Sequence, residues 1–289
     1  MKNEHVSVML QEVLAALPAR RPLVIVDGTL GLGGHALEMA KVGGVGSALI
    51  GIDWDERNLK LAQDRLTQDL PPGISSVLIH DSYANLGKSV EPGMADVILL
   101  DLGFSSLHVD DPTRGFSFMK DGPLDMRYNM QGEITAADLI NGAPREELAA
   151  IFRQYGEEPA AERIAKAICV ARKEQKFLTT LALANFIETI VPRHGKVHPA
   201  TRIFQALRIA VNDELGQVER GITAATLALA PGGRLLIITF HSLEDRLAKT
   251  LPKTLGLEPL TKKPQTPGPA ELKQNPRARS AKLRVYSKI

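Results

Sequence analysis

Cysteine is almost absent, because Cys169 is the only one in the 289 residues. A single thiol can form neither an internal disulfide nor a cysteine metal cluster, and IAKAICVAR is typical of a helix interior. We therefore favour a small core residue over a reactive nucleophile. The chain also lacks an apolar run of the ~18 residues that span a bilayer, and MKNEHVSVML has no signal-peptide core. We expect a cytoplasmic protein that makes no membrane contact.

Aromatic residues are also scarce, at 4% of the chain, which argues against a broad platform for stacked bases. The net charge is only +2, but it is unevenly distributed. Residues 261–289 hold eight Lys or Arg and one acid, a net charge of +7, so the remaining residues carry −5. This basic segment with four prolines favours an anionic partner, although a solvated tail fits the composition equally well.

Short apolar runs rich in Val, Ile and Leu are present in the first hundred residues. They cover residues 23–27, 48–53, 76–80 and 95–101. Helical patterns separate the first three runs, at residues 35–42 and 56–68. Buried strands that alternate with helices predict βαβ units, and therefore an α/β fold with a doubly wound, Rossmann-like sheet.

The pattern changes after residue 101. A loop rich in Gly, Pro and Asp leads to helical patterns at 145–155, 159–174, 179–191 and 199–216. A helix at 217–229 then precedes an apolar strand at 234–240, and KLRVYSKI could supply a final strand. We therefore expect a first part of the sheet domain at 1–105, a mainly helical insertion for substrate recognition at 106–210, and a second part with the basic tail at 211–289.

The first strand leads into VDGTLGLGGHA, with glycines at 28, 31, 33 and 34. Glycine lets the backbone adopt positive φ and approach a ligand closely, as in dinucleotide- or adenosyl-binding loops. Asp53 ends the second strand about 20 residues later, where a carboxylate can accept hydrogen bonds from ribose hydroxyls.

The loop alone does not identify the cofactor. Gly31, Gly33 and Ala36 also satisfy the nicotinamide-type pattern G-x-G-x-x-A. Two acids favour S-adenosylmethionine instead. Asp27 enters the loop and could meet a cationic methionine group, and Asp101 ends the fourth strand and faces the same crevice.

Longer segments resemble a known family. They are HVSVMLQE (5–12), DGTLGLGGH (27–35), LLDLGFSS (99–106), RGFSFMKDGPLDMR (114–127), YGEE (155–158), HPATRIFQALRIAVNDEL (198–215), ITFHSLEDR (238–246) and NPRARSAKLR (275–284). In these segments the chain closely resembles the bacterial small-subunit (16S) ribosomal RNA cytosine-N4 methyltransferases, the MraW-like family. The resemblance implies a class I S-adenosylmethionine-dependent methyltransferase domain, interrupted by a helical domain.

The resemblance also implies an activity and a cofactor site. The activity is methyl transfer from S-adenosylmethionine to the exocyclic N4 of a cytidine in the decoding region of small-subunit (16S) ribosomal RNA. The partner is then that RNA or the small ribosomal subunit. The implied cofactor-binding residues are Gly33, Gly34, His35, Asp53, Tyr83, Asp101 and His108. The family's S-S-P-Q-L reads S-S-L-H-V here, so Leu107 and His108 replace the usual proline and glutamine.

Asp101 is the best-placed candidate for catalysis. The exocyclic nitrogen is a weak nucleophile, and an acceptor on its N–H would help to localise the lone pair. Asp101 could act in this way or bind only the cofactor; Asp125 and the pair His241-Ser242 are weaker candidates. Methylation at carbon C5 would need an attacking cysteine, which Cys169 does not offer. We expect no catalytic metal, because the candidate ligands His194 and His198 flank a glycine and lack the glutamate of a zinc helix.

Four basic residues lie in the matching segments: Arg127, His198, Arg202 and Arg208. They could bind RNA phosphates, or they could pair with acids such as Asp213 and Glu214 inside the fold. Trp54 could shield an adenine, but we favour surface packing.

Two other classes of protein remain open. A nicotinamide-dependent oxidoreductase fits the glycine loop but not the segments beyond residue 100. A noncatalytic ribosome-assembly factor with a vestigial pocket is opposed by the intact Asp53 and Asp101. The sequence does not predict the oligomeric state.

Overall fold

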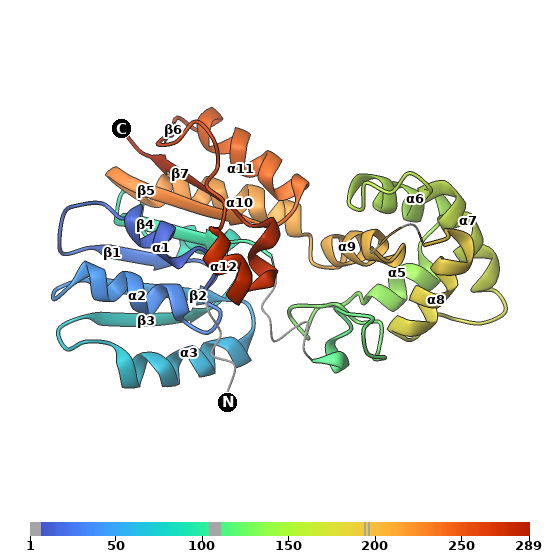
Figure 1. The fold of residues 1–289 in the computed structure, drawn as a ribbon. Helices are drawn as coiled ribbons and strands as arrows, with labels where there is room; N and C mark the ends of the chain where they lie inside the picture. The colour runs from blue at the N-terminus through green and yellow to red at the C-terminus, as the bar shows by residue number, and fades with distance from the viewer. Residues whose placement is uncertain (1–6, 104–110, 194, 196) are drawn as a thin grey trace. The chain divides into compact units, whose positions relative to one another are not determined.

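The computed structural model describes residues 7–103, 111–193, 195 and 197–289. The chain divides into two units, which we call the sheet unit (residues 1–103 and 215–289) and the helical unit (residues 104–214). Figure 1 shows the strands in the first and the helices α5 to α9 in the second. The inserted segment expected from the sequence, 106–210, lies within the helical unit.

Within the described residues, seven strands form one sheet in the order β3-β2-β1-β4-β5-β7-β6. They are β1 (Val24–Asp27), β2 (Ala48–Asp53), β3 (Ser75–His80), β4 (Ala95–Asp101), β5 (Leu229–Thr239), β6 (Glu258–Pro259) and β7 (Lys282–Ser287). The pairs from β3 to β5 are parallel, and β7 is antiparallel to both β5 and β6. The strand order reverses between β1 and β4, which is where open α/β sheets bind ligands. The expected doubly wound α/β fold is confirmed.

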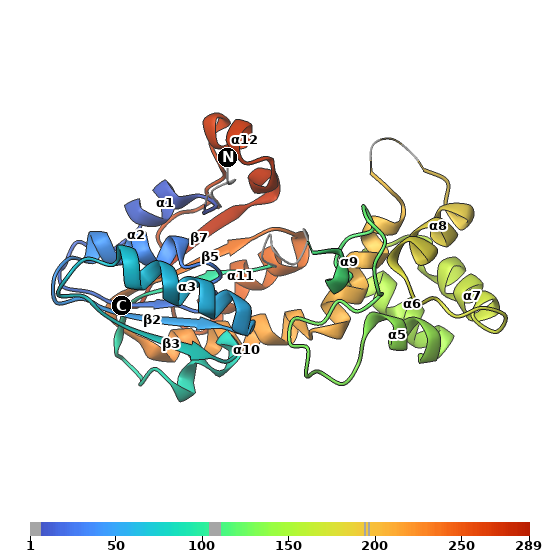
Figure 2. The same ribbon diagram turned by 90° about the horizontal axis from the view of Figure 1, so that it is seen from below.

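Alternating side chains of the central strands enter two different cores. Val97 and Leu99 of β4 belong to the core that includes side chains of α2 (Gly34–Gly43) and α3 (Glu56–Asp69). Ile98 and Leu100 belong to the core that includes side chains of α10 (Glu214–Ala228). Figure 2 shows α2 and α3 on one side of the sheet and α10 on the other. This burial on both faces explains why the strands read as continuous apolar runs.

A capping side chain fixes the start of α3 in the sheet unit. Asp55 is the N-cap of α3, and its side chain accepts a hydrogen bond from the backbone N–H of Arg57. The other helices of this unit are α1 (Leu10–Ala15), the 3-10 helix η1 (Tyr83–Lys88), α11 (Ser242–Thr254), α12 (Pro269–Gln274) and the 3-10 helix η3 (Pro276–Ser280).

The helical unit has its own hydrophobic core, which includes Phe152, Ile164, Leu183 and Leu207. Its elements are the 3-10 helix η2 (Pro112–Arg114), α5 (Ala136–Gly142), α6 (Arg145–Gln154), α7 (Ala161–Ala171), α8 (Thr180–Ile190) and α9 (Ala200–Val211). Across the described part of the chain, no helix has the length and hydropathy needed to cross a bilayer.

Two elements differ from the sequence-based expectation. The boundary between the helices expected at 199–216 and 217–229 lies earlier in the chain, because α9 ends at Val211 and α10 begins at Glu214. At the break, the Asn212 side chain bonds to the 126–128 loop, and Asp213 has a positive φ of 47°. Strand β5 begins at Leu229 rather than at 234, because Leu229 pairs with Ala95 before the register shifts at Val97.

Candidate active site

The loop between β1 and α2 lies at the carboxyl end of the sheet and depends on glycine. Gly31 has φ +52° and Gly33, the N-cap of α2, has φ +74°, a region that side chains disfavour. A Cβ at Gly34 would lie 2.2 Å from the hydroxyl of Ser7. The loop therefore brings bare backbone and the N-terminus of α2 to the crevice beyond β1, as the sequence predicts for a cofactor loop.

Asp53 ends β2, and hydrogen-bond donors fix its carboxylate. Oδ2 accepts the backbone N–H of Gly31 at 2.7 Å, and Oδ1 accepts the backbone N–H of Asp55 at 2.8 Å and the Nδ2 group of Asn58 at 3.2 Å. Burial raises the pKa of Asp53, while the hydrogen bonds from Asp55 and Gly31 oppose that rise. The side chain that we expect to bind ribose is therefore held rigidly against the glycine loop.

Tyr83 follows β3 as the first residue of η1. Two glycines leave room for it. A Cβ at Gly221 on α10 would lie 2.3 Å from Cδ2 and 2.6 Å from Cε2 of the ring, and a Cβ at Gly28 would lie 3.1 Å from its Cβ. One edge of the aromatic ring therefore lies against the backbone of α10, and its position depends on the absence of a side chain at residue 221.

Two acids, the buried Asp27 and the partly buried Asp101, end the adjacent strands β1 and β4. Asp27 is 1% exposed, and its Oδ1 accepts the backbone N–H of Thr29 at 3.1 Å. Oδ1 of Asp101 is buried and has no hydrogen-bond partner among the described residues. Within the same part of the chain, neither acid forms an ion pair with Lys or Arg. The Thr29 hydroxyl accepts the backbone N–H of Asp101 at 2.7 Å, which joins the two strand ends.

The surroundings of these acids favour their neutral forms. Burial raises the pKa of Asp27 to about 7, and the charge of Asp53 adds to the effect. Burial also raises the pKa of Asp101 well above its usual range, helped by the negative charges of Asp27 and Glu244. A cation or a hydrogen-bond donor at this edge would relieve the unfavourable burial of charge.

His35, the second residue of α2, is buried beside this pair. Its Nε2 lies 2.8 Å from the carbonyl oxygen of Val8, an acceptor, so Nε2 donates its proton there. Its Nδ1 faces Oδ2 of Asp101 at 3.8 Å. The structure therefore brings His35 and Asp101 together, as expected of residues in one site.

Comparisons with known proteins show the family of this chain. A sequence profile of the MraW methylase family matches residues 2–289. The chain belongs to that family. A protein of Dictyoglomus thermophilum named Ribosomal RNA small subunit methyltransferase H is 44% identical over 288 residues, covering 99% of this chain and 97% of its own. A protein of the same name from Elusimicrobium minutum is 45% identical over 290 residues, covering 99% and 98%. A solved SAM-dependent methyltransferase from Aquifex aeolicus aligns at a TM-score of 0.46 and 7% identity, covering 98% and 90% of the two chains.

Membership of the MraW methylase family confirms the resemblance stated from the sequence segments. It also opposes the oxidoreductase alternative that the pattern at Gly31 and Gly33 had left open. His108 and Leu107, where the sequence departs from the family's usual motif, lie outside the described residues.

The four basic residues considered as phosphate ligands all contact acids within the helical unit. Arg208 forms a two-pronged ion pair with Glu214 at 2.7 and 2.9 Å. The other three pairs are Arg127 with Asp125 at 2.7 Å, His198 with Glu188 at 3.4 Å and Arg202 with Glu158 at 3.9 Å. Internal pairing, the second of the two interpretations, therefore describes Arg208, whose partner Glu214 was foreseen. The contact of Arg202 is longer, and its side chain is 54% exposed.

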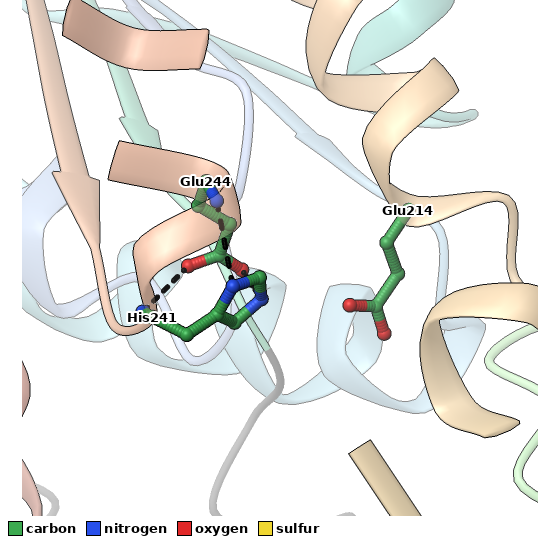
Figure 3. Close-up of side chains that lie close together, drawn as sticks. All are labelled: Glu214, His241 and Glu244. Carbon is green, nitrogen blue, oxygen red and sulfur yellow. Dashed lines mark hydrogen bonds and ion pairs between the residues drawn. The ribbon is translucent and has the colours of Figure 1, made fainter. Parts of the chain in front are cut away.

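The weaker catalytic candidates also have structural roles. Burial would raise the pKa of Asp125, but hydrogen bonds from Arg127 outweigh it and lower that pKa. His241 is the N-cap of α11: its Nδ1 accepts the backbone N–H of Glu244 at 3.4 Å, and the Glu244 carboxylate accepts the backbone N–H of His241 at 3.3 Å. Figure 3 shows these two contacts. Cys169 packs against the helical core, which agrees with its interpretation as a small core residue.

The basic C-terminal segment is partly built into the sheet. Lys282 and Arg284 of β7 pair with Asp245 of α11 at 3.1 and 2.8 Å. The ammonium group of Lys288 donates to the carbonyl oxygens of Thr226, Leu227 and Leu229 at 2.8 to 3.3 Å. Three of its eight cations therefore brace the fold, and Lys262, Lys263, Lys273 and Arg279 remain exposed.

Three site residues were missed by the sequence analysis: Asn58, which donates to Asp53; Thr29, which joins β1 to β4; and Gly221, under Tyr83. Gly221 had one available signal, because an isolated glycine inside a helical pattern usually has a packing or functional reason. The residue it accommodates is far away in sequence, so the partner could not be deduced.

Proposed function

We propose that this chain transfers a methyl group from S-adenosylmethionine to the exocyclic N4 of a cytidine in the decoding region of small-subunit (16S) ribosomal RNA. Membership of the MraW methylase family and relatives named for the small subunit support this reaction. The partner is then small-subunit RNA or the small ribosomal subunit itself. Such a substrate agrees with the expected cytoplasmic location.

One observation supports amine chemistry at this edge. Oδ1 of Asp101 is a buried acceptor with no donor among the described residues. Burying an acceptor without a partner costs about 1–3 kcal/mol, so a ligand N–H that occupies it is favoured. The exocyclic amine of cytosine supplies such a donor.

The residues around the glycine loop also fit the proposed cofactor. When bound, S-adenosylmethionine supplies a methyl group that is already activated on a positively charged sulfonium. Asp27 and Asp101 offer two carboxylates without a Lys or Arg partner among the described residues, which suits a cationic ligand. Asp53 is directed by its donors to accept ribose hydroxyls, and Tyr83 offers a ring face for the adenine.

In this proposal Asp101 acts on the amine. The positive charge of a bound cofactor would favour the ionised form of Asp101, whose Oδ1 accepts a hydrogen bond from the N–H and so localises the nitrogen lone pair. As the new N–C bond forms and the bond from carbon to sulfur breaks, the same carboxylate takes the proton that the nitrogen loses. Gly33 and Gly34 hold the cofactor in line, so most of the rate enhancement comes from orientation. His35, fixed by the carbonyl of Val8, holds the Asp101 carboxylate in place. The helical unit takes the role of recognising the RNA.

Mass mapping of methylated cytidines in small-subunit RNA, from cells with and without the protein, tests the proposal. We expect one N4-methylated cytidine of the decoding region to disappear when the gene is deleted and to return with the wild-type chain. An unchanged methylation map would contradict the proposed substrate. Return of the mark with Asp101→Asn at the wild-type rate would remove Asp101 from the chemistry while leaving the substrate assignment intact.

A further inference from the structure

A groove on the helical unit combines an apolar floor with a basic rim. Helices α7 and α8 pack against each other, and a groove of about 600 Å³ lies between them. Its floor is formed by Ala167, Val170, Ala171, Phe186 and Ile190, and its rim by Arg163, Lys166 and Glu174.

The spacing of the α7 residues explains why one helix supplies both floor and rim. Positions 163, 166, 170 and 174 follow the three-to-four-residue period of one helix face. The opposite face, with Ile164 and Ile168, is buried in the helical core. No described residue packs over the face of α7 that lines the groove in this way, and Val170 on that face is 60% exposed. A single exposed valine would be ordinary, but here it belongs to a floor of five apolar side chains inside a charged rim, which is the form that an interaction surface takes.

The groove lies in the most basic stretch of the helical unit. Residues 163–176 contain five Lys or Arg and one acid, a net charge of +4. Residues 104–214 as a whole contain fourteen Lys or Arg and fifteen acids, so the rest of the unit carries −5. The cationic stretch is therefore a local feature and not a general property of the unit.

Most cations of this stretch form no ion pair with another described residue. Arg172 donates to the carbonyl oxygen of Ile140, but Arg163, Lys166, Lys173 and Lys176 are exposed and form no ion pair with another described residue. By contrast, the guanidinium groups of Arg145 and Arg153 on α6 lie 3.4 and 3.7 Å from Glu162. The acid that precedes the groove is thus already paired with cations from another helix.

We propose that the α7–α8 groove, with the turn at residues 172–176, is a binding surface for single-stranded RNA. The exposed cations contact phosphates, and the apolar floor receives the face of one base or ribose. This inference rests on the proposed RNA substrate and adds the place on the helical unit where that RNA is held. Phosphate contacts fix position without reading sequence, as a substrate-holding surface away from the reacting base requires.

The test compares two variants of the full chain with equal charge. In Arg163→Gln/Lys166→Gln the groove rim is neutralised. In Arg145→Gln/Arg153→Gln the same charge is removed from α6, where it is already paired. Binding to a single-stranded RNA oligonucleotide of the decoding region is measured by fluorescence anisotropy from 50 to 300 mM salt. We expect the plot of log affinity against log salt to become shallower by about 1.5 for the groove variant and to stay at the wild-type slope for the α6 variant.

A third variant tests the floor without touching a cation. Val170→Asp places a carboxylate in the groove at a position exposed enough to leave folding intact, and its melting temperature checks this. We expect RNA affinity to fall at least threefold. Wild-type affinity and slope in both the rim and floor variants would overturn the proposal. Normal binding to the oligonucleotide with weakened binding to whole small subunits would also overturn it, because the groove would then meet a ribosomal protein.

The proposed function is judged separately in the same preparations. Methylation of small subunits is followed at saturating cofactor, where the groove variants should show a raised KM and an unchanged kcat. If the wild-type chain binds the oligonucleotide through the groove but methylates no small-subunit RNA, the reaction assignment fails and the RNA surface stands.

Discussion

Buried charges are treated in opposite ways in the two units. In the helical unit, Arg208 and Glu214 are 9% and 7% exposed, and each satisfies the other through two hydrogen bonds. In the sheet unit, the buried Asp27 and the partly buried Asp101 have no Lys or Arg partner among the described residues, and their pKa values are raised. A fold does not need lone buried acids, because they oppose its stability. The paired charges therefore serve structure, and we propose that the acids without a cation mark the place where a ligand completes the site.

Breaking the paired charge should have the largest effect. Replacing Arg208 by Met leaves Glu214 buried without its cation, so we expect the free energy of unfolding to fall by about 3–5 kcal/mol. Denaturant titration of the purified chain measures this. The matched change in the sheet unit is Asp27→Asn, which removes a lone buried acid and should leave stability at pH 8 unchanged or raised. A large loss of stability in Asp27→Asn would contradict the contrast between the units.

The next effect concerns Asp101. Asp101→Asn keeps the shape but weakens the acceptor for the amine, so we expect kcat for methyl transfer to fall by about 100-fold at saturating cofactor and RNA. Stability should not fall, since the buried charge is removed. A rate that recovers fully at saturation would limit Asp101 to cofactor binding.

The acids at the strand ends and the ion pair of Arg208 with Glu214 also differ in how far the sequence predicted them. Asp27, Asp53 and Asp101 were found because each ends an apolar run, and parallel strands bring their carboxyl ends to one edge of a sheet. The pairing of Arg208 with Glu214 was one of two open interpretations, because position in the chain cannot show whether an arginine faces solvent.

The same limit applies to the fold. The strands β1, β2 and β4 were predicted nearly to the residue, since burial on both faces gives an unbroken run of Val, Ile and Leu. The break between α9 and α10 was predicted between residues 216 and 217, but α9 already ends at Val211. Its cause is a hydrogen bond from the Asn212 side chain to the backbone of Met126, 86 residues earlier, which leaves no local pattern.

A smaller effect is expected from Gly221→Ala. The added methyl group displaces the Tyr83 ring, so we expect S-adenosylmethionine to bind about tenfold more weakly, a loss of about 1.4 kcal/mol. Once the cofactor is saturating, kcat should be close to that of the wild type. Calorimetry measures the affinity, and Thr223→Ala on the same helix is the control. Equal affinity in the two variants would show that Tyr83 lies outside the cofactor site.

The smallest expected effect is that of Asp27→Asn on how the melting temperature of the ligand-free chain depends on pH. Asp27 has a pKa of about 7 in the folded chain and 3.8 as its ordinary value. Its protonated form therefore favours the fold fully below about pH 4, and this contribution is lost as the pH rises through 7. We expect the melting temperature of the wild type to fall by about 2–4 °C more than that of Asp27→Asn between pH 5 and 8. Identical pH profiles would mean that Asp27 is ionised throughout this range.

The interruption of the sheet unit has a consequence for synthesis on the ribosome. Strand β4 pairs with β5, yet residues 102–228 are made between them. At about 5–20 residues per second, one edge of β4 waits roughly 6–25 s for its neighbour. The helical core, whose buried members lie between Leu124 and Leu207, is made from contiguous chain and can fold during that interval. An apolar strand left open for so long is a template for pairing with other nascent chains, which makes β4 the point at which a chaperone would most improve the yield of native protein.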